Sequence, residues 1–395
     1  MRSCGQGQGG YDALVVGGGP AGAAAGTLLA RRGLSVLILD KARFPRDKVC
    51  GGALSGSAAQ LVTQIFGSDA LSRIASVSST ACRVYFAGEL VAEVRGGERI
   101  LLARRWELDG HLLSLAAQAG CTVAEGCKVV GVDLRRSVVR LATGEELRGH
   151  IIVGADGASS VVARSANGCA RSTGRYSFCL AAEVPVERLR GWGRGDFADH
   201  CLHIDFGRSA WGYGWVFPRG ETASVGLHGM LARNRRLPEA LRDFVEAQCV
   251  AGTYERLKIE GRLMPWGDFE RRPGRGNLLL VGDAAGLIDP VTGEGIGPAL
   301  QSALLAAQAI EKSLARGSPG AAGPLYDRLL RQELWPRLRQ AARTRWLLYP
   351  RPCLRLAMHS MRRHPELLRW FLEVVSGRMS YRRYVWRLLG TLLGG

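Results

Sequence analysis

The sequence predicts an α/β protein in three parts: a domain built on a parallel sheet, an inserted antiparallel-sheet domain, and a helical C-terminal region. A glycine-rich turn joins an apolar run at 11–16 to an alanine-rich stretch at 23–32, which is the order strand, turn, helix. Residues 166–265 hold more aromatic residues and alternate apolar with polar positions, as antiparallel strands do. From about residue 298 onward, apolar residues recur at helical spacing.

Length and composition set the number of domains. The chain has 395 residues, of which 47% are hydrophobic and 22% charged, so it has a globular composition with room for two or three domains. Short apolar runs at 151–153 and 278–281 each end in Gly and Asp and suit central strands of the first sheet. We place the parallel-sheet domain at 11–60, 101–165 and 270–315, the inserted domain, expected to bind substrate, at 61–100 and 166–269, and a basic amphipathic helical region at 316–395.

The turn at residues 17–22 reads Gly-Gly-Gly-Pro-Ala-Gly and is typical of a dinucleotide site. Gly17 permits the tight bend, Gly19 lets the backbone approach a pyrophosphate, and Gly22 lets the helix pack closely on the strand. Ala21 belongs to the same turn, where free N–H groups and the positive end of the helix dipole face the anion. These features predict a Rossmann-like domain.

An acidic residue follows the second apolar run of this βαβ unit. Asp40 lies 18 residues beyond Gly22, near the interval expected for the carboxylate that binds ribose hydroxyls. We assign Asp40 and its neighbour Lys41 to the cofactor site. A glycine-rich turn without a ligand is the alternative in a chain with 53 glycines.

Two further motifs decide which dinucleotide is expected. Gly282-Asp283-Ala-Ala-Gly follows the run 278–281 and resembles the second flavin fingerprint of FAD enzymes. An Asp at a strand end can accept hydrogen bonds from ribitol or ribose hydroxyls. Asp156-Gly157 resembles the Asp-Gly motif of aromatic-hydroxylase-like flavoproteins. Three such motifs in this order predict FAD as the cofactor of the parallel-sheet domain.

The resemblance narrows to one family. The segments Pro-Arg-Asp-Lys-Val-Cys-Gly-Gly at 45–52, Tyr-Gly-Trp-Val-Phe-Pro at 213–218 and Asp-Pro-Val-Thr-Gly-Glu-Gly-Ile at 289–296 resemble motifs of the geranylgeranyl reductase family. Residues 105–109 and 377–381 also fit its pattern. That family reduces isoprenoid double bonds with FAD. Gly297-Pro298 stand where we expect bulkier residues.

The resemblance implies the place of the flavin ring. Cys50 and Gly51 should lie near the ring, and the segment from Gly293 through Gly295 to Ile296 should pass against its pyrimidine side, where N–H groups can stabilise the anionic reduced flavin. A buried, inert thiol is the alternative for Cys50. Arg105 is expected to pair with a cofactor phosphate, or else to be an exposed arginine at a helix start.

The implied reaction needs an apolar tunnel and an acid. Tyr213, Trp215 and Phe217 are expected to line the tunnel for a polyprenyl chain, with simple core packing as the alternative. Reduced FAD would transfer a hydride from N5 to a trisubstituted alkene, and a proton would add to the neighbouring carbon. Cys50, Tyr213 and Glu294 are the candidate catalytic residues that could supply this proton.

Alternatives to this reaction stay open. An FAD-dependent monooxygenase or halogenase would share the cofactor fold, and a non-catalytic lipid carrier would merely retain a flavin. A second dinucleotide turn is absent, so an NADPH electron donor would have to bind without its own Rossmann domain, and reduced ferredoxin is an equal alternative. The head group of the prenylated lipid and the oligomeric state are not predicted.

The formal net charge of +18 concentrates at the C-terminal end, where residues 328–395 hold fifteen arginines against three glutamates. Cations beside an apolar stripe suit contact with a membrane surface, whereas helices packed on the body with a solvated basic face are the alternative. Nucleic-acid binding is not expected, because no recognisable module appears. No apolar stretch is long enough to span a bilayer.

The cysteines and histidines bear on compartment and metal. Ten cysteines form no Cys-x-x-Cys pair, which favours mostly reduced thiols in a cytoplasmic protein. If the basic C-terminal region does contact a membrane, we expect that contact to be peripheral and at the cytoplasmic face. His200 and His203 are spaced like metal ligands but lack a third ligand, so we expect structural roles and no metal.

Overall fold

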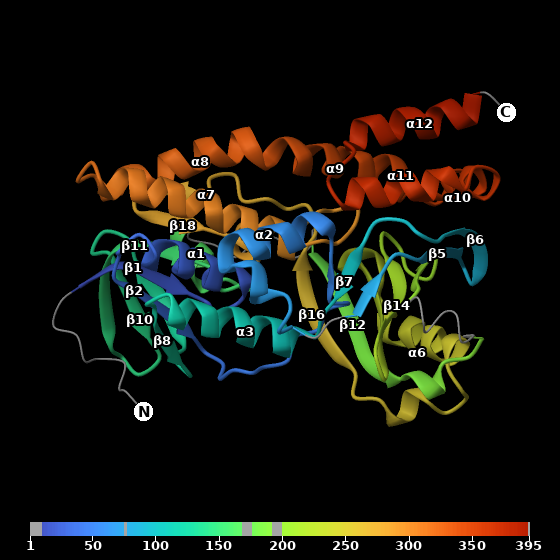
Figure 1. The fold of residues 1–395 in the computed structure, drawn as a ribbon, viewed down its shortest axis with the longest axis horizontal. Coiled ribbons are helices and arrows are strands. Elements are labelled where there is room, and N and C mark those ends of the chain that lie inside the picture. The colour runs from blue at the N-terminus through green and yellow to red at the C-terminus, as the bar shows by residue number, and fades with distance from the viewer. Residues whose placement is uncertain (1–9, 75–76, 168–175, 192–199, 394–395) are drawn as a thin grey trace.

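The computed structural model describes residues 10–74, 77–167, 176–191 and 200–393. Two sheet domains lie side by side, and the C-terminal helices run along one side of both (Figure 1). The predicted combination of a parallel sheet, an antiparallel sheet and C-terminal helices is confirmed. None of the described helices has the length and apolar character needed to cross a membrane.

The first sheet carries the dinucleotide turn. Its strands are β1 (Tyr11–Val16), β2 (Val36–Asp40), β8 (Thr122–Glu125), β9 (Val129–Asp133), β10 (Val138–Leu141), β11 (Glu146–Gly154), β17 (Gly274–Arg275) and β18 (Leu278–Leu280). The central order is β17-β18-β11-β1-β2-β8, and β18, β11, β1, β2 and β8 are parallel. The strand order reverses at β1, because the chain runs from β1 to β2 and β8 on one side and later forms β11 on the other side. A ligand site is therefore expected at the carboxyl ends of these strands.

Helices pack around this sheet because its central strands are apolar throughout. Leu14 of β1 pairs with Ile152 on one side and Leu37 on the other, and all three are fully buried. The main helices here are α1 (Pro20–Ala30), α2 (Gly56–Phe66), α3 (Arg105–Gln118), α4 (Val161–Asn167) and α7 (Ile296–Leu314). α1 packs against both α3 and α7, which positions its N-terminus at the sheet edge.

The second sheet forms the inserted domain. Its strands are β5 (Cys82–Phe86), β6 (Glu89–Val94), β12 (Tyr176–Pro185), β13 (Leu202–Phe206), β14 (Tyr213–Arg219), β15 (Thr222–Met230) and β16 (Glu260–Pro265). They lie in the order β16-β12-β15-β14-β13-β5-β6, antiparallel except between β13 and β5. Helix α6 (Leu237–Gln248) packs on β15 and β12. A small third sheet consists of β3 (Ala53–Leu54), β7 (Ile100–Leu102) and β4 (Val77–Ser79), and β5 and β6 of the second sheet lie between β4 and β7 in sequence.

Five helices follow α7: α8 (Ala322–Glu333), α9 (Trp335–Leu348), α10 (Arg351–Arg363), α11 (Glu366–Val375) and α12 (Tyr381–Leu393). α8 packs on the first sheet, where the Tyr326 hydroxyl donates to the Leu280 carbonyl at 2.8 Å. α10 and α11 instead pack on β6 of the second sheet. The C-terminal helices therefore bridge the two domains (Figure 1).

Two predicted domain boundaries differ from the packing. The boundary between residues 60 and 61 falls inside α2, whose buried residues join the core of the first sheet domain. Tyr326 and Leu330 of α8 join that same core, although they follow the boundary at 316. In both places the apolar face of a continuous helix decides the packing.

The cysteines of the described residues are mostly free thiols. Seven are free, and Cys127 is disulfide-bonded. Five of the free thiols are buried core residues: Cys82, Cys121, Cys179, Cys201 and Cys249.

Candidate active site

The glycine turn after β1 has the tight geometry that the sequence predicts. Gly17 has φ +108° and donates its N–H to the Leu39 carbonyl at 2.7 Å. A Cβ at Gly17 would lie 2.4 Å from the Ala155 carbonyl oxygen, and one at Gly22 would lie 1.8 Å from the Gly17 oxygen. No side chain fits at either position, because real Cβ contacts are not this short.

The start of α1 can receive an anion. The helix begins at Pro20, which lacks an N–H, and its first intrahelical bond runs from the Ala23 N–H to the Gly19 carbonyl at 2.9 Å. The N–H groups of Ala21 and Gly22 precede that bond and have no partner within the helix. Arg46 lies beside this turn, with Nη2 3.6 Å from the Cβ position of Gly19. Its Nη1 is buried and has no hydrogen-bond partner in the described part of the chain, so a donor is left for a ligand.

Asp40 stands at the end of β2, as predicted, and its carboxylate is held by backbone. Oδ2 accepts from the Gly18 N–H at 2.7 Å and Oδ1 from the Ala42 N–H at 2.8 Å. Each oxygen keeps a lone pair for a ribose hydroxyl. The adjacent Lys41 is exposed and is not brought into this cradle.

The hydrogen bonds of the Asp156 side chain also stay within its own segment of the chain. Its carboxylate accepts from the Ser160 hydroxyl at 2.5 Å and from the Val161 N–H at 2.6 Å, so it fixes the start of α4. Burial raises the pKa of Asp156, although these hydrogen bonds oppose the shift. Gly157 has φ +80°, and its Cβ position lies 3.4 Å from Arg262 Nη2 of β16 in the other domain.

A cluster of charged residues lies between α1, α3 and β16. We call it the cation cluster, and it consists of Arg46, Lys48, Arg105 and Arg262 with the carboxylates of Asp109 and Asp283. Lys48 Nζ lies 3.5 Å from Asp283 Oδ2, and Arg46 Nη2 lies 3.0 Å from Asp109 Oδ2. Burial and the neighbouring Arg105 lower the pKa of Lys48 to about 8. Four cations against two carboxylates leave an excess of two positive charges, which a pyrophosphate would neutralise.

Burial excludes one of the two predicted roles of Arg105. Arg105 is only 4% exposed, so the alternative of an exposed arginine at a helix start is wrong. Its Nε and Nη2 donate to the two oxygens of Asp109 at 2.8 and 2.7 Å. Burial acts to lower its pKa, but the Asp109 carboxylate holds the pKa above the usual value. Arg105 therefore orders the cluster through Asp109, and its contact with a cofactor phosphate stays a prediction.

One cavity joins the predicted ring site to the second domain. It encloses about 1060 Å³ of space, with the open solvent at its mouth included. One wall is the segment from Cys50 to Gly52 together with Thr292, Gly293 and Glu294. Trp215 and Phe217 of β14 form an apolar wall, and α11 closes another side. Three predicted ring-site residues, Cys50, Gly51 and Gly293, thus face the same space as the predicted tunnel residues, whereas Gly295 and Ile296 are not among the residues that line it.

The second flavin fingerprint and the segment after it pack against the first turn. Gly282 has φ +56°, and a Cβ there would lie 3.2 Å from the Cβ of Ala21. A Cβ at Gly295 would lie 3.5 Å from Asp283 Oδ1, so this carboxylate faces the start of α7. Ile296 begins α7 and is buried. Motifs 260 residues apart in sequence therefore meet at one site.

The candidate proton donors occupy different environments. Cys50 Sγ accepts from the Gly52 N–H at 3.3 Å. The Tyr213 hydroxyl donates to the Thr292 carbonyl at 2.6 Å, and burial raises the pKa of Tyr213. Its proton is thus held by a backbone oxygen.

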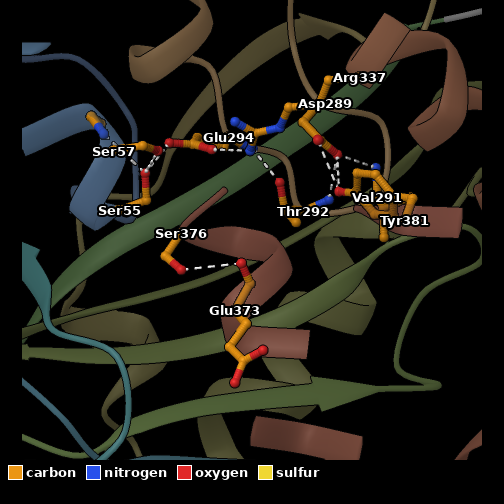
Figure 2. A network of polar contacts seen from close by, with 11 residues as sticks. Ser55, Ser57, Asp289, Val291, Thr292, Glu294, Arg337, Glu373, Ser376 and Tyr381 are labelled. Carbon is orange, nitrogen blue, oxygen red and sulfur yellow. Dashed lines mark hydrogen bonds and ion pairs between the residues drawn. The ribbon is translucent and has the colours of Figure 1, made fainter. Parts of the chain in front are cut away.

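Glu294 is held from two sides (Figure 2). Its Oε1 accepts from the Ser55 hydroxyl at 2.5 Å, and its Oε2 lies 3.1 Å from Arg337 Nη2 of α9. Burial raises the pKa of Glu294, although Arg337 and the Ser55 hydrogen bond oppose this. Gly297 has room for hydrogen only, because a Cβ there would lie 2.8 Å from Glu294 Oε1. The small residue at 297 therefore accommodates the carboxylate.

Comparison with known proteins agrees with this geometry. Residues 10–210 match the FAD binding domain family. The chain is 31% identical over 320 residues to the geranylgeranyl diphosphate reductase of Rhodobacter capsulatus, covering 78% of this chain and 77% of that protein. The chain belongs to the geranylgeranyl reductase family of FAD-dependent oxidoreductases.

Other relatives of this geranylgeranyl reductase family member have different names. The menaquinone reductase of Mycobacterium tuberculosis is 30% identical over 343 residues, which cover 80% of this chain and 81% of that protein. Among solved structures, a geranylgeranyl bacteriochlorophyll reductase-like protein of Thermoplasma acidophilum has a TM-score of 0.75 at 24% identity, covering 88% and 91% of the two chains. A flavin-dependent brominase has a TM-score of 0.71 at 18% identity, covering 93% and 94%. The last two likenesses concern the fold alone.

The site fits the FAD that membership of the family implies. The free N–H groups of α1, the unpartnered Nη1 of Arg46 and the excess charge of the cation cluster suit the pyrophosphate. Asp40 and Asp283 offer oxygens to ribose and ribitol hydroxyls. Bound FAD would supply the redox chemistry that the side chains of this family member cannot.

Besides Arg46 and Ser55, four residues at this site were not predicted from the sequence. Lys48 and Arg262 join the cation cluster, Arg337 binds Glu294, and His228 lines the cavity. Lys48 stands within the motif at 45–52, which was a usable signal. The other three lie in segments whose pattern carries no motif, and only packing brings them to the site.

Proposed function

We propose that this protein reduces carbon–carbon double bonds in the isoprenoid chain of a prenylated lipid, with FAD as its cofactor. The observation that carries the proposal is the cavity in which the Cys50 and Gly293–Glu294 segments meet the apolar wall of Trp215 and Phe217. A polyprenyl chain is apolar along its length and is stabilised by such walls. Names of relatives that include geranylgeranyl reductases support the same substrate class.

The protein's own residues would exclude water and align the alkene. When bound and reduced, FAD supplies a hydride to one alkene carbon. The apolar walls hold the chain in one orientation, which removes much of the entropic cost of bringing the groups together. Oxidised FAD then requires an electron donor, for which NADPH and reduced ferredoxin are both proposed.

The neighbouring alkene carbon needs a proton, and the described geometry favours Glu294 and Cys50 over Tyr213 as its source. Tyr213 already donates to the Thr292 carbonyl. Burial raises the pKa of Glu294, which favours the protonated acid. A carboxylic acid or thiol beside the alkene can deliver the proton as the hydride arrives.

The test is anaerobic reoxidation. The purified flavoprotein is reduced with dithionite, mixed with prenylated lipids that differ in head group, and followed by its flavin spectrum and by mass spectrometry. We expect reoxidation with a gain of two hydrogens per double bond. Oxygen consumption with a hydroxylated or halogenated product would instead support a monooxygenase or halogenase. A flavin that no prenyl lipid reoxidises would support a lipid carrier.

We also propose that the C-terminal helices contact a membrane surface. Five large apolar side chains are exposed on them: Trp346, Leu347, Leu356, Trp386 and Leu389. Trp386 is 66% exposed, and arginines 382, 383 and 387 share its helix. Aromatic residues beside cations suit an anionic lipid surface, from which a prenylated lipid would be drawn.

A further inference from the structure

Ser55 connects Glu294 to the outside of the candidate active site. It is the N-cap of α2 and is 3% exposed. Its Oγ accepts from the Ala58 N–H at 3.2 Å and donates to Glu294 Oε1 at 2.5 Å. Both Ser55 and Glu294 line the cavity. The hydroxyl proton of Ser55 is therefore already directed toward the carboxyl group.

The direction of the next hydrogen bond follows from this arrangement. Ser57 Oγ lies 3.0 Å from Ser55 Oγ, so the two hydroxyls are hydrogen-bonded. A hydroxyl has one proton to donate, and that of Ser55 points to Glu294. While Glu294 is a carboxylate, Ser57 therefore donates to Ser55, and the three groups form a chain oriented from Ser57 inward (Figure 2).

The outer end of the chain lies near the surface. Ser57 is half-buried, and the exposed Gly377 lies beside it, with its Cβ position 3.8 Å from Ser57 Oγ. The same Cβ position is 3.7 Å from Arg337 Nη1, so Arg337 borders this end as well. Water can reach the region of Ser57 and Gly377 without entering the apolar cavity.

We propose that Ser57 and Ser55 relay protons from solvent to Glu294, which replaces the proton delivered to the substrate. In each cycle Glu294 loses a proton to the alkene carbon and becomes a carboxylate. Ser55 then passes its proton to Oε1 and takes one from Ser57, which takes a hydrated proton from the solvent, and this proton balances the charge of the transferred hydride. No charge or electron is left over. This inference rests on the proposed function, because it assigns the proton supply of that reaction.

Arg337 is a positioning residue in this scheme. Its Nη2 holds Glu294 Oε2 at 3.1 Å, which leaves Oε1 for Ser55. The opposing contributions of burial and Arg337 keep the carboxyl group able to change protonation state. Arg337 itself donates nothing to the substrate.

The decisive comparison is Ser57→Val with Ser57→Thr, since the two side chains have the same shape and only threonine keeps the hydroxyl. Ser57 does not cap α2, so neither variant removes the cap.

We expect Ser57→Thr to reduce a prenyl lipid at nearly the wild-type rate. Ser57→Val should reduce the lipid at least roughly ten-fold more slowly. A positioned acid accelerates a reaction by roughly 10²–10⁴-fold, and loss of its proton supply should remove part of that acceleration. Its solvent deuterium isotope effect should rise, while flavin reoxidation by ferricyanide, which protonates no carbon, should match wild type. Equal rates and isotope effects in the two variants would overturn the relay.

A second measurement separates the relay from the proposed function. In FAD-loaded protein with the cavity filled by a prenyl lipid, infrared spectroscopy follows deuterium exchange at the Glu294 carboxyl group, which Glu294→Gln identifies by removing its band. We expect slower exchange in Ser57→Val than in Ser57→Thr. If wild type reduces no alkene, the proposed function fails, and this exchange still decides the relay. Unchanged exchange means that the proton enters through the cavity and that the relay is wrong.

Discussion

The hydroxyl of Tyr381 lies 2.8 Å from each carboxylate oxygen of Asp289, and this contact joins α12 to the segment that lines the cavity (Figure 2). Asp289 is fully buried, and its Oδ1 also accepts from the N–H groups of Val291 and Thr292. Burial and the Asp289 carboxylate raise the pKa of Tyr381 well above its usual value. The C-terminal helices therefore form part of the candidate active site.

Tyr381→Phe should lower the free energy of unfolding by about 1.5–3 kcal/mol, because a buried carboxylate loses a hydrogen-bond donor. Chemical denaturation measures this change. Tyr384→Phe, on the same helix, is the control, because no hydrogen bond of its hydroxyl is found in the described structure. Equal losses of stability in the two variants would show that the contact with Asp289 adds nothing to the effect of removing a buried hydroxyl.

Arg46→Met should weaken FAD binding by roughly 10–100-fold, since a hydrogen bond to a charged group contributes about 1.5–3 kcal/mol. Titration of the apoprotein with FAD, followed by flavin fluorescence, gives the affinity. Arg43→Met is the matched control, because Arg43 belongs to the same segment and is exposed. If both variants bind FAD like wild type, the unpartnered Nη1 of Arg46 does not meet the pyrophosphate.

Gly22→Ala should yield protein without bound flavin and destabilise it by about 1–3 kcal/mol. The added Cβ would lie 1.8 Å from the Gly17 oxygen, so the turn and α1 must separate. The measurements are flavin absorbance after purification and thermal unfolding. Gly131→Ala should change neither, because no atom lies within 4 Å of its Cβ position. A Gly22→Ala protein that retains FAD would contradict the cradle.

His228 should make the protein acid-sensitive. Burial lowers the pKa of His228 to about 3, and its Nδ1 is 3.2 Å from Ser177 Oγ, which donates to the Gly229 carbonyl. The imidazole faces the Tyr213, Trp215 and Trp266 rings. The folded state thus excludes a proton that the unfolded chain binds below the ordinary histidine pKa of 6.5, so stability is full above pH 6.5 and falls as the pH drops toward 3.

At pH 5 the protonation of His228 in the unfolded chain should lower the free energy of unfolding by about 2 kcal/mol relative to neutral pH. Denaturation at several pH values should therefore give a flatter profile for His228→Asn than for wild type. His359→Asn, at an exposed site, should retain the wild-type slope. An unchanged slope in His228→Asn would place the acid sensitivity elsewhere.

Trp386→Ser combined with Leu389→Ser should reduce binding to phosphatidylglycerol-containing vesicles by roughly ten-fold or more, as expected from the loss of two apolar side chains. Co-sedimentation measures the bound fraction, and added salt should weaken binding further. Leu231→Ser removes an exposed apolar residue outside the C-terminal helices and should leave binding unchanged. Binding that is indifferent to all three substitutions would argue against this surface.

Local sequence determined the cofactor cradle and most of the secondary structure. Gly17 and Gly22 were identifiable because only glycine satisfies a positive φ or a backbone contact this close. Central strands such as 151–153 were identifiable from apolar runs, since they are buried on both faces. These constraints act between near neighbours in the chain, so a short window of sequence contains them.

Tertiary structure alone decided how the site is completed. Ser55 and Glu294 are 239 residues apart, and Tyr381 and Asp289 are 92 apart, with no local pattern that pairs them. The sequence alone did not predict that Asp109 accepts hydrogen bonds from Arg105 Nε and Nη2. Burial makes such pairings obligatory, because a charge removed from water must find a partner. Which partner it finds depends on how the two domains and the C-terminal helices pack, and that information is spread over the whole chain.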